Sequence, residues 1–188
     1  VAIADFDGDG KLDLAFSEAG VFNAYVSVYR NTSTTGALSF TGPTTIQGLS
    51  YSDGPLEAAD LDGDGRPEII SVFNNSCASG ARLYVFPNRS SPGILDFCSY
   101  QTFGNIYTCG GTMSVADMDG DHLSDVVFTT GSTGANISIL RNSSTPGAIN
   151  LDAAFQVATL GGGNVTLADF DGDGLTDIAW PGYSTDNI

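Results

Sequence analysis

Four short segments of the chain repeat one arrangement of carboxylates and glycines. The first runs Asp-Phe-Asp-Gly-Asp-Gly-Lys-Leu-Asp from Asp5 to Asp13, with carboxylates at positions one, three, five and nine. In a tightly turning loop the first three of these side chains point toward one centre, position seven supplies a backbone carbonyl, and position nine adds a carboxylate. Six or seven hard oxygen ligands of this kind suit Ca²⁺. The glycines at positions four and six allow the positive φ that the turn needs.

The same pattern predicts four Ca²⁺ sites along the chain. The predicted ligands are the side chains of Asp5, Asp7, Asp9, Asp13, Asp60, Asp62, Asp64, Glu68, Asp117, Asp119, Asp121, Asp125, Asp169, Asp171, Asp173 and Asp177, together with the backbone carbonyls of Lys11, Arg66, Leu123 and Leu175. With no histidine or thiolate among these positions, zinc and copper fit poorly. Mg²⁺ fits less well than Ca²⁺ because it prefers a tighter octahedron and keeps its waters.

Repetition separates a metal loop from an ordinary polar turn. One Asp-Gly-Asp-Gly stretch is equally well explained as a solvated turn. Here, however, the four loops hold 16 of the 22 acidic residues, four in each. Two loops depart from the pattern, with Glu68 at position nine of the second and His122 at position six of the third. Because a positive φ is costly for a residue other than glycine, we expect the third site to be the weakest.

The frame around the loops predicts β-structure rather than an EF-hand. An EF-hand requires flanking helices and a glutamate at position twelve, but that position holds Phe16, Ser71, Phe128 and Trp180. Short β-branched and aromatic runs follow the loops at residues 12–16, 68–73, 125–128 and 177–180. Alternating runs follow at 25–29, 82–86 and 136–140, with a fourth strand expected near 38–40, 95–97 and 153–155. Each loop therefore lies between the first two strands of a repeating unit.

The spacing of the loops predicts a β-propeller-type array. Successive position-one aspartates are 55, 57 and 52 residues apart, at Asp5, Asp60, Asp117 and Asp169. A period in the fifties suits one four-stranded antiparallel blade per repeat. We expect one all-β repeat domain over residues 1–188, with units of about 1–50, 51–108, 109–160 and an incomplete 161–188. The resulting 14 strands make about three and a half blades, with open edges that missing sequence or another chain must cover.

The repeat resembles the FG-GAP/VCBS family. The resemblance rests on Val-Ala-x-Ala-Asp-Phe-Asp-Gly-Asp-Gly-x-x-Asp followed by an apolar strand, and on the polar turn at residues 30–36 with its two relatives at 87–93 and 141–147. It implies integrin-α-like propeller blades, commonly seven, with calcium in the hairpin between the first two strands. It also implies an extracellular or cell-surface setting. It implies no single activity, because such repeats occur in adhesins, lectin-like proteins and accessory regions of secreted enzymes.

Composition narrows the classes of partner. Twenty-two acidic residues against six basic ones give a formal charge of −16, which argues against a nucleic-acid partner. No apolar stretch approaches the roughly 18 residues that a membrane span needs. Extracellular calcium modules bind at about 10⁻⁴–10⁻³ M, which matches calcium outside cells and favours an extracellular or surface location.

Cysteines and glycosylation sequons each leave two interpretations open. With three cysteines, Cys77, Cys98 and Cys109, at least one is unpaired within the chain. A Cys98–Cys109 bridge is slightly preferred as a pairing, but small buried hydrophobes explain these residues about as well. Sequons begin at Asn31, Asn74, Asn88, Asn136, Asn142 and Asn164. We favour a turn-forming role over glycosylation, because three of them occupy equivalent turns.

No arrangement typical of an enzyme is found. The chain has one histidine and no Gly-x-Ser-x-Gly, and the paired acids Asp53 and Glu57 read better as solvated connection residues. Aromatic residues in connections suit sugar stacking or protein contact, with core packing as the rival explanation: Tyr51, Tyr100, Phe103, Tyr107 and Tyr183. The sequence favours a non-catalytic, calcium-stabilised adhesion or recognition module binding protein or glycan. The alternatives are a structural subunit of a surface polymer, self-associating through open strand edges, and an accessory domain of a secreted enzyme.

Overall fold

The computed structural model describes residues 1–19, 24–49, 54–74, 81–106, 111–129, 136–158 and 164–180. These residues form fourteen β-strands and no helix, as the sequence predicts. The strands are β1 (Ala2–Ala4), β2 (Asp13–Ala19), β3 (Ala24–Asn31), β4 (Phe40–Leu49), β5 (Leu56–Ala59), β6 (Glu68–Asn74), β7 (Ala81–Phe86), β8 (Gln101–Ile106), β9 (Met113–Ala116), β10 (Asp125–Thr129), β11 (Asn136–Leu140), β12 (Phe155–Ala158), β13 (Thr166–Ala168) and β14 (Asp177–Ala179). Within this described part, no helix is present that could cross a membrane.

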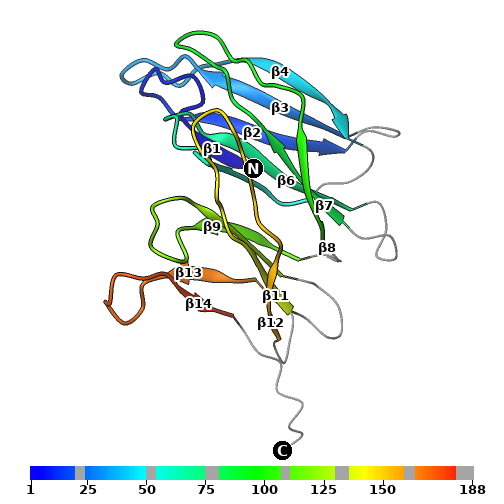
Figure 1. Cartoon of the computed structure of the whole chain (residues 1–188). Helices are drawn as coiled ribbons and strands as arrows, with labels where there is room; N and C mark the ends of the chain where they lie inside the picture. Colours follow the sequence, from blue (N-terminus) through cyan, green and yellow to red (C-terminus); the bar gives the residue numbers. More distant parts are fainter. Residues whose placement is uncertain are drawn as a thin grey trace, which may run out of the picture.

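The strands form three four-stranded sheets and one two-stranded sheet. Blade 1 is β1-β2-β3-β4, blade 2 is β5-β6-β7-β8, blade 3 is β9-β10-β11-β12, and blade 4 is β13-β14. Every neighbouring pair is antiparallel and consecutive in sequence. The blades stack in chain order, and the first strands of successive blades lie in contact (Figure 1). The architecture is a partial, open propeller-like array, as expected from the period of the repeat.

The core consists of layers between blades, because each strand turns alternate residues toward opposite neighbours. In β6, Ile69 joins the buried cluster shared with blade 1, while the next residue, Ile70, joins the cluster shared with blade 3. The blade 2 clusters thus bury both faces of that sheet. A third, smaller cluster contains Val127, Ile137 and Val165 between blades 3 and 4. A blade face therefore remains apolar and exposed wherever no neighbouring blade covers it.

The start of the fourth strand differs from the prediction in blade 2. It was expected near residues 38–40, 95–97 and 153–155; β4 and β12 begin at Phe40 and Phe155, at the end of the expected ranges, whereas β8 begins only at Gln101. The preceding residues form a small hairpin of their own, closed by the bridges Thr34–Ala37, Ser91–Ile94 and Thr145–Ala148. This hairpin, which we call the blade turn, spans residues 31–40, 88–97 and 142–151. In blades 1 and 2 it includes residues 38–40 and 95–97, which resemble a strand in the sequence, whereas in blade 3 residues 153–155 follow the turn and lead into β12.

Candidate metal centres

The four acidic loops occupy equivalent places, each joining the first two strands of a blade. They connect β1 to β2, β5 to β6, β9 to β10 and β13 to β14, and they project from one side of the stack (Figure 1). We number them loops 1 to 4, for residues 5–13, 60–68, 117–125 and 169–177. Because the strands on either side are paired in antiparallel register, the two ends of each loop are held together.

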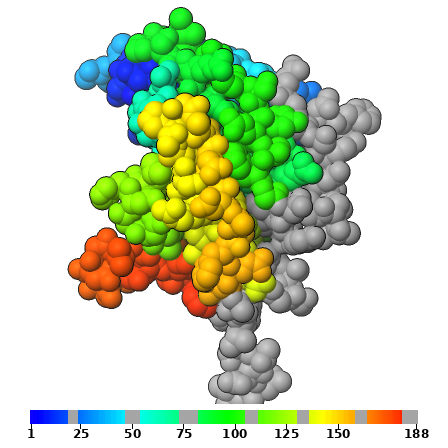
Figure 2. Space-filling view, in the orientation of Figure 1, coloured from blue at the N-terminus to red at the C-terminus, as the bar shows by residue number. Residues whose placement is uncertain are grey.

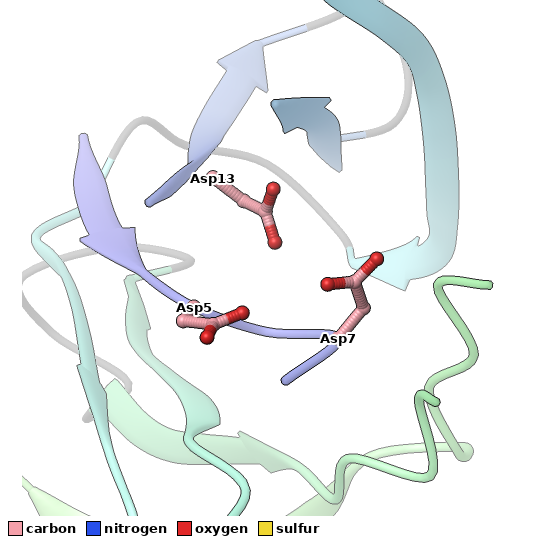
Figure 3. Close-up of side chains that lie close together, drawn as sticks. All are labelled: Asp5, Asp7 and Asp13. Atoms are coloured by element: carbon pink, nitrogen blue, oxygen red, sulfur yellow. The ribbon is translucent and has the colours of Figure 1, made fainter. Parts of the chain in front are cut away.

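Carboxylates from positions one, three and nine converge in every loop. In loop 1, Asp5, Asp7 and Asp13 point toward one another (Figure 3). Each offers an oxygen within 4.8 Å of the others, and the same holds for the equivalent groups Asp60, Asp62 and Glu68, then Asp117, Asp119 and Asp125, then Asp169, Asp171 and Asp177. Three carboxylates at this separation repel unless a cation lies between them. The donors are all oxygen, so the arrangement fits a hard divalent cation.

The position-one carboxylate folds the loop around itself. Asp5 Oδ1 accepts the N–H of Gly8 at 2.8 Å, and Asp5 Oδ2 accepts the N–H of Gly10 at 2.7 Å. Both glycines have positive φ, at 73° and 87°, which brings their N–H groups inward. The three other loops repeat these bonds from positions four and six. The loop geometry is thus encoded within six consecutive residues.

The third loop carries the expected backbone strain. His122, at position six, is the one described non-glycine residue with positive φ, at 71°. Its N–H still bonds to Asp117 Oδ2 at 2.9 Å, so the turn is retained. The imidazole is 96% exposed, which is consistent with a turn residue rather than a metal ligand. The cost of the left-handed conformation is consistent with the prediction that this site is the weakest.

In loops 1 to 3 the position-nine carboxylates are buried and tie the loop to the first residue of the blade turn. Asp13 accepts the N–H of Phe6 at 3.0 Å and that of Asn31 at 2.7 Å. Glu68 in loop 2 and Asp125 in loop 3 make the equivalent pairs of bonds. Burial raises the pKa of Asp13 and Asp125, and it raises the pKa of Glu68 to about 7. A bound cation would relieve this penalty, because it stabilises the ionised form.

The position-five carboxylates lie outside the converging groups. Asp9 Oδ1 accepts the N–H of Lys11, and its Oδ2 accepts a bond from Arg30 at 2.5 Å. Asp64, Asp121 and Asp173 accept the equivalent N–H from position seven. The assignment of these four aspartates, and of the position-seven carbonyls of Lys11, Arg66, Leu123 and Leu175, stays a prediction.

An arginine engages the loop carboxylates in blades 1 and 3. Arg30, at the end of β3, donates through Nε to Asp7 and through a terminal nitrogen to Asp9. Burial would raise the pKa of Asp7, but bonds from Arg30 and from the N–H groups of Gly93 and Asp9 lower it. Arg141 contacts Asp119 and Asp121 in the same way. Blade 2 has Pro87 at the equivalent position, so loop 2 lacks this guanidinium.

Sequence reasoning missed a contact that loops 1 and 2 each make with the next blade. The Asn88 side-chain amide donates to the Phe6 carbonyl at 2.9 Å, and the Gly93 N–H donates to Asp7 Oδ2 at 2.9 Å. The turn of blade 3 repeats both bonds on loop 2, from Asn142 to the Leu61 carbonyl at 2.8 Å and from Gly147 to Asp62 at 2.7 Å. Figure 2 shows this turn, in yellow, lying against the blade above it. The sequence signal that could have indicated this contact is the motif Asn-x-Ser-x-x-Gly, which recurs in all three blade turns.

These contacts also bear on the sequons. The amides of Asn88 and Asn142 are buried, and each donates a second bond to a carbonyl of its own blade, at Pro67 and Ser124. Asn31 donates to its own Leu12 carbonyl at 2.9 Å. The turn-forming interpretation therefore has structural support at all three residues.

Loops 1 and 2 are enclosed, whereas loops 3 and 4 are open. The position-three carboxylates Asp7 and Asp62 are 1% and 6% exposed, because the next blade turn covers them. The Asp119 side chain is 37% exposed. The position-two residue follows the same trend, since Phe6 is fully buried and Phe170 is 58% exposed.

The aromatic, acidic and cysteine residues that the sequence analysis named do not form a second site among the described residues. Tyr51, Tyr107, Tyr183, Asp53, Cys77 and Cys109 lie outside the described residues. Tyr100 is partly exposed, with its ring edge-on to Tyr84 at 5.0 Å, and Phe103 packs on the core between blades 2 and 3. Cys98 is a half-buried free thiol, so the preferred bridge to Cys109 has no support here. Burial raises the pKa of Glu57.

Comparison with known proteins agrees with this geometry. The family model of the FG-GAP-like repeat matches residues 5–71 and 117–180. Each matched range begins at position one of a loop and contains two loops. Among curated proteins, no match to the chain is found. Loops, strands and blade order together place the chain in the family of FG-GAP-like repeat proteins.

Proposed function

We propose that the chain is a calcium-stabilised, non-catalytic recognition module, with one Ca²⁺ held in each of its four loops. The observation that supports this most directly is the convergence of three carboxylates in every loop, within 4.8 Å. Positions one, three and nine would hold the ion by side chains. Position five and the position-seven carbonyl complete the proposed ligand set.

The role proposed for calcium is structural. A cation in loop 1 would neutralise Asp5, Asp7 and Asp13, which belong to one loop but contact three different segments. Asp13 bonds to the Asn31 N–H at the end of β3, and Asp7 bonds to the turn of blade 2. Fixing these carboxylates would therefore fix the loop against its own sheet and against the next blade.

We further propose an extracellular or cell-surface setting and a protein or glycan ligand. FG-GAP-like repeats are typical of such modules, and loops of moderate affinity fill only at the calcium concentrations found outside cells. The alternatives remain a structural subunit of a surface polymer and an accessory domain of a secreted enzyme. We also propose that residues 1–188 belong to one repeat domain.

The calcium proposal is tested by thermal unfolding followed by circular dichroism, in millimolar Ca²⁺, in excess chelator and in Mg²⁺. One site filled at about one hundred times its dissociation constant adds roughly 2.7 kcal/mol to the free energy of unfolding. We expect chelator to lower the melting temperature sharply and only Ca²⁺ to restore it. A melt that ignores calcium would show that the loops are solvated turns.

A matched pair of variants locates the effect. Asp7→Asn removes a carboxylate from a converging group, whereas Asp96→Asn removes one outside the loops. Only Asp7→Asn should reduce the calcium-dependent gain in melting temperature.

The recognition part of the proposal is tested with the calcium-loaded chain on arrays of glycans and extracellular-matrix proteins. Absence of calcium-dependent binding to any of them would contradict that part of the proposal.

A further inference from the structure

In blades 1 and 3 the residue before the turn asparagine is an arginine whose side chain lies over the loop of its own blade. Arg30 donates through Nε to the position-three carboxylate Asp7 and through a terminal nitrogen to the position-five carboxylate Asp9. Arg141 repeats both bonds on loop 3. The carboxylates at positions three and five thus form a site for a guanidinium, whose planar fork of donors matches paired oxygen acceptors.

Blade 2 has Pro87 at this position, and the backbone there keeps the same bonds. The Pro87 carbonyl accepts the N–H of Cys98 at 2.9 Å, as the Arg141 carbonyl accepts that of Asp152 at 2.8 Å. The N–H of the next residue, Asn88, donates to the position-nine carboxylate of loop 2, as its counterparts do in blades 1 and 3. The proline therefore removes one side chain from the site and leaves the frame around it in place.

A cavity of about 500 Å³ lies beside this proline, between two complete blades. Its lining includes the position-three and position-five carboxylates, Asp62 and Asp64, together with Pro87 itself. The turn of blade 3 contributes Gly147 and Ile149. The carboxylates that hold an arginine in the other blades thus face open space in blade 2.

Asp62 is the group in this cavity with the greatest need of a cation. It is 6% exposed, and its Oδ2 accepts the N–H of Gly147 at 2.7 Å. Asp7 combines the equivalent bond from Gly93 with an ion pair to Arg30. Among the described residues, Asp62 forms no ion pair. A buried carboxylate without a counter-charge is costly, so a cationic group in the cavity would be stabilised.

The calcium ion proposed for loop 2 does not account for the cavity. Loop 1 has the same converging carboxylates and nevertheless holds an arginine as well. A water molecule takes up roughly 30 Å³, so the cavity has room for a side chain in addition to an ion and its waters.

The other walls limit what the ligand can be. Arg66 and Arg89 also line the cavity, and Arg66 contacts Asp64 at 3.3 Å. Because these two cations repel further positive charge, the cavity disfavours a basic tract. It favours a single guanidinium flanked by neutral or acidic groups.

We propose that this cavity, which we call the loop 2 pocket, binds the arginine side chain of a peptide or protein partner. The guanidinium bridges Asp62 and Asp64, in the place that Arg30 takes on loop 1. This ligand class rests on the recognition role proposed above. The pocket itself needs no calcium in loop 2. A calcium ion would use the same two carboxylates, so the ion and the arginine should weaken each other by the same factor.

Nuclear magnetic resonance titration of the whole chain tests the proposal, with glycyl-arginyl-glycine, blocked at both ends, as the probe. The titration uses the lowest calcium concentration at which circular dichroism shows the chain folded. We expect saturable shifts of the Asp64 and Gly147 amide signals, with a dissociation constant in the millimolar range. Peptides with citrulline or lysine in place of arginine should bind at least about fivefold more weakly, because citrulline lacks the charge and lysine lacks the planar fork.

Three variants locate the binding. Pro87→Arg supplies the guanidinium from the chain itself, as in blades 1 and 3, so it should fold and no longer bind the peptide. Asp64→Asn should weaken binding by about tenfold, because the bond to the guanidinium loses its charge. Asp96→Asn is the control, since Asp96 belongs to the blade 2 turn but does not line the pocket. Circular dichroism melts verify that each variant is folded.

The outcomes separate the pocket from the calcium proposal. Added calcium should weaken peptide binding by roughly three- to tenfold. Peptide binding that does not change with calcium would support the pocket and contradict an ion in loop 2. A natural chain without shifts, equal binding of the lysine or citrulline peptide, or undiminished binding by Pro87→Arg would each overturn the pocket.

Discussion

At the scale of single residues, the loops differ most in whether an arginine side chain contacts their carboxylates. In loops 1 and 3 an arginine bridges the carboxylates at positions three and five. A metal ion must share these carboxylates with the guanidinium. In blade 2 the equivalent residue is Pro87, and the only ion pair that the described residues form with loop 2 is the longer Arg66–Asp64 pair at 3.3 Å.

This difference predicts a change in calcium affinity. Arg30→Gln should strengthen calcium binding at loop 1 by roughly three- to tenfold, since a partly buried ion pair contributes about 1 kcal/mol. The metal-free protein should lose a similar amount of stability. Pro87→Arg should weaken loop 2. Isothermal titration calorimetry measures both, with the exposed Arg89→Gln as control. Unchanged affinity in both variants would show that the arginines do not compete.

Glu68 predicts an unusual pH dependence of the metal-free protein. Burial raises its pKa from 4.5 to about 7 on folding, so between these values the folded state holds a proton that the unfolded state has lost. The free energy of unfolding in chelator should therefore fall as pH rises through this window, by up to about 3 kcal/mol. Calcium should weaken the fall, because it binds the ionised carboxylate.

Urea unfolding from pH 4.5 to 7.5 measures this effect. Glu68→Gln, which carries no titrating group, should show a shallower decline than the natural chain. Equal slopes for the two proteins would mean that Glu68 ionises normally in the folded state.

At the scale of elements, the blade turn is what joins one unit to the next. It places an asparagine amide between two backbone carbonyls, one from its own blade and one from the preceding loop. Asn142 and Leu61 are fully buried, so the Leu61 carbonyl has no access to water, whereas Ser124 is half-buried. A buried carbonyl left without a donor costs free energy.

Two substitutions measure how much the bond from the blade turn to the preceding loop contributes to stability. Asn142→Ala should lower the free energy of unfolding by about 2–3 kcal/mol, because the buried Leu61 carbonyl and the half-buried Ser124 carbonyl both lose their donor. Asn31→Ala removes one donor at a half-buried turn and should cost about 1 kcal/mol. Chemical denaturation in saturating Ca²⁺ measures the difference. Equal costs would show that the bond from Asn142 to loop 2 contributes nothing.

At the scale of the whole molecule, the stack is asymmetric. Its first two loops are covered by the next blade turn, whereas loops 3 and 4 are open among the described residues. Enclosure excludes water and fixes ligand orientation, so it should favour metal binding. Loop 3 combines an open position, the bridging Arg141 and the strained His122.

Calcium titration should therefore resolve two classes of site. We expect tight binding at loops 1 and 2 and weaker binding at loops 3 and 4, with loop 3 weakest. In calorimetry, Asp62→Asn should remove a tight site and Asp119→Asn a weak one. If both substitutions remove sites of the same affinity, enclosure by the neighbouring blade does not control binding.

Much of this protein follows from the sequence alone. The four loops, their converging carboxylates, the second and third strands and the propeller-like order were predictable, because they depend on contacts within a few residues. Asp5, for example, shapes its loop through N–H groups three to five residues away. Alternation of apolar residues then identifies the strands that hold the loop.

Other features were decided only by the tertiary structure. Asn88 and Gly93 reach loop 1 from 82 and 86 residues away, and no local pattern specifies that partner. The pKa of Glu68 depends on burial that arises when the blades pack. Phe40 and Phe97 occupy equivalent positions in their blade turns, yet Phe40 is 39% exposed and Phe97 packs on the core between blades 1 and 2. Only the stacking of the blades distinguishes them, because a residue is buried or exposed according to what lies against it.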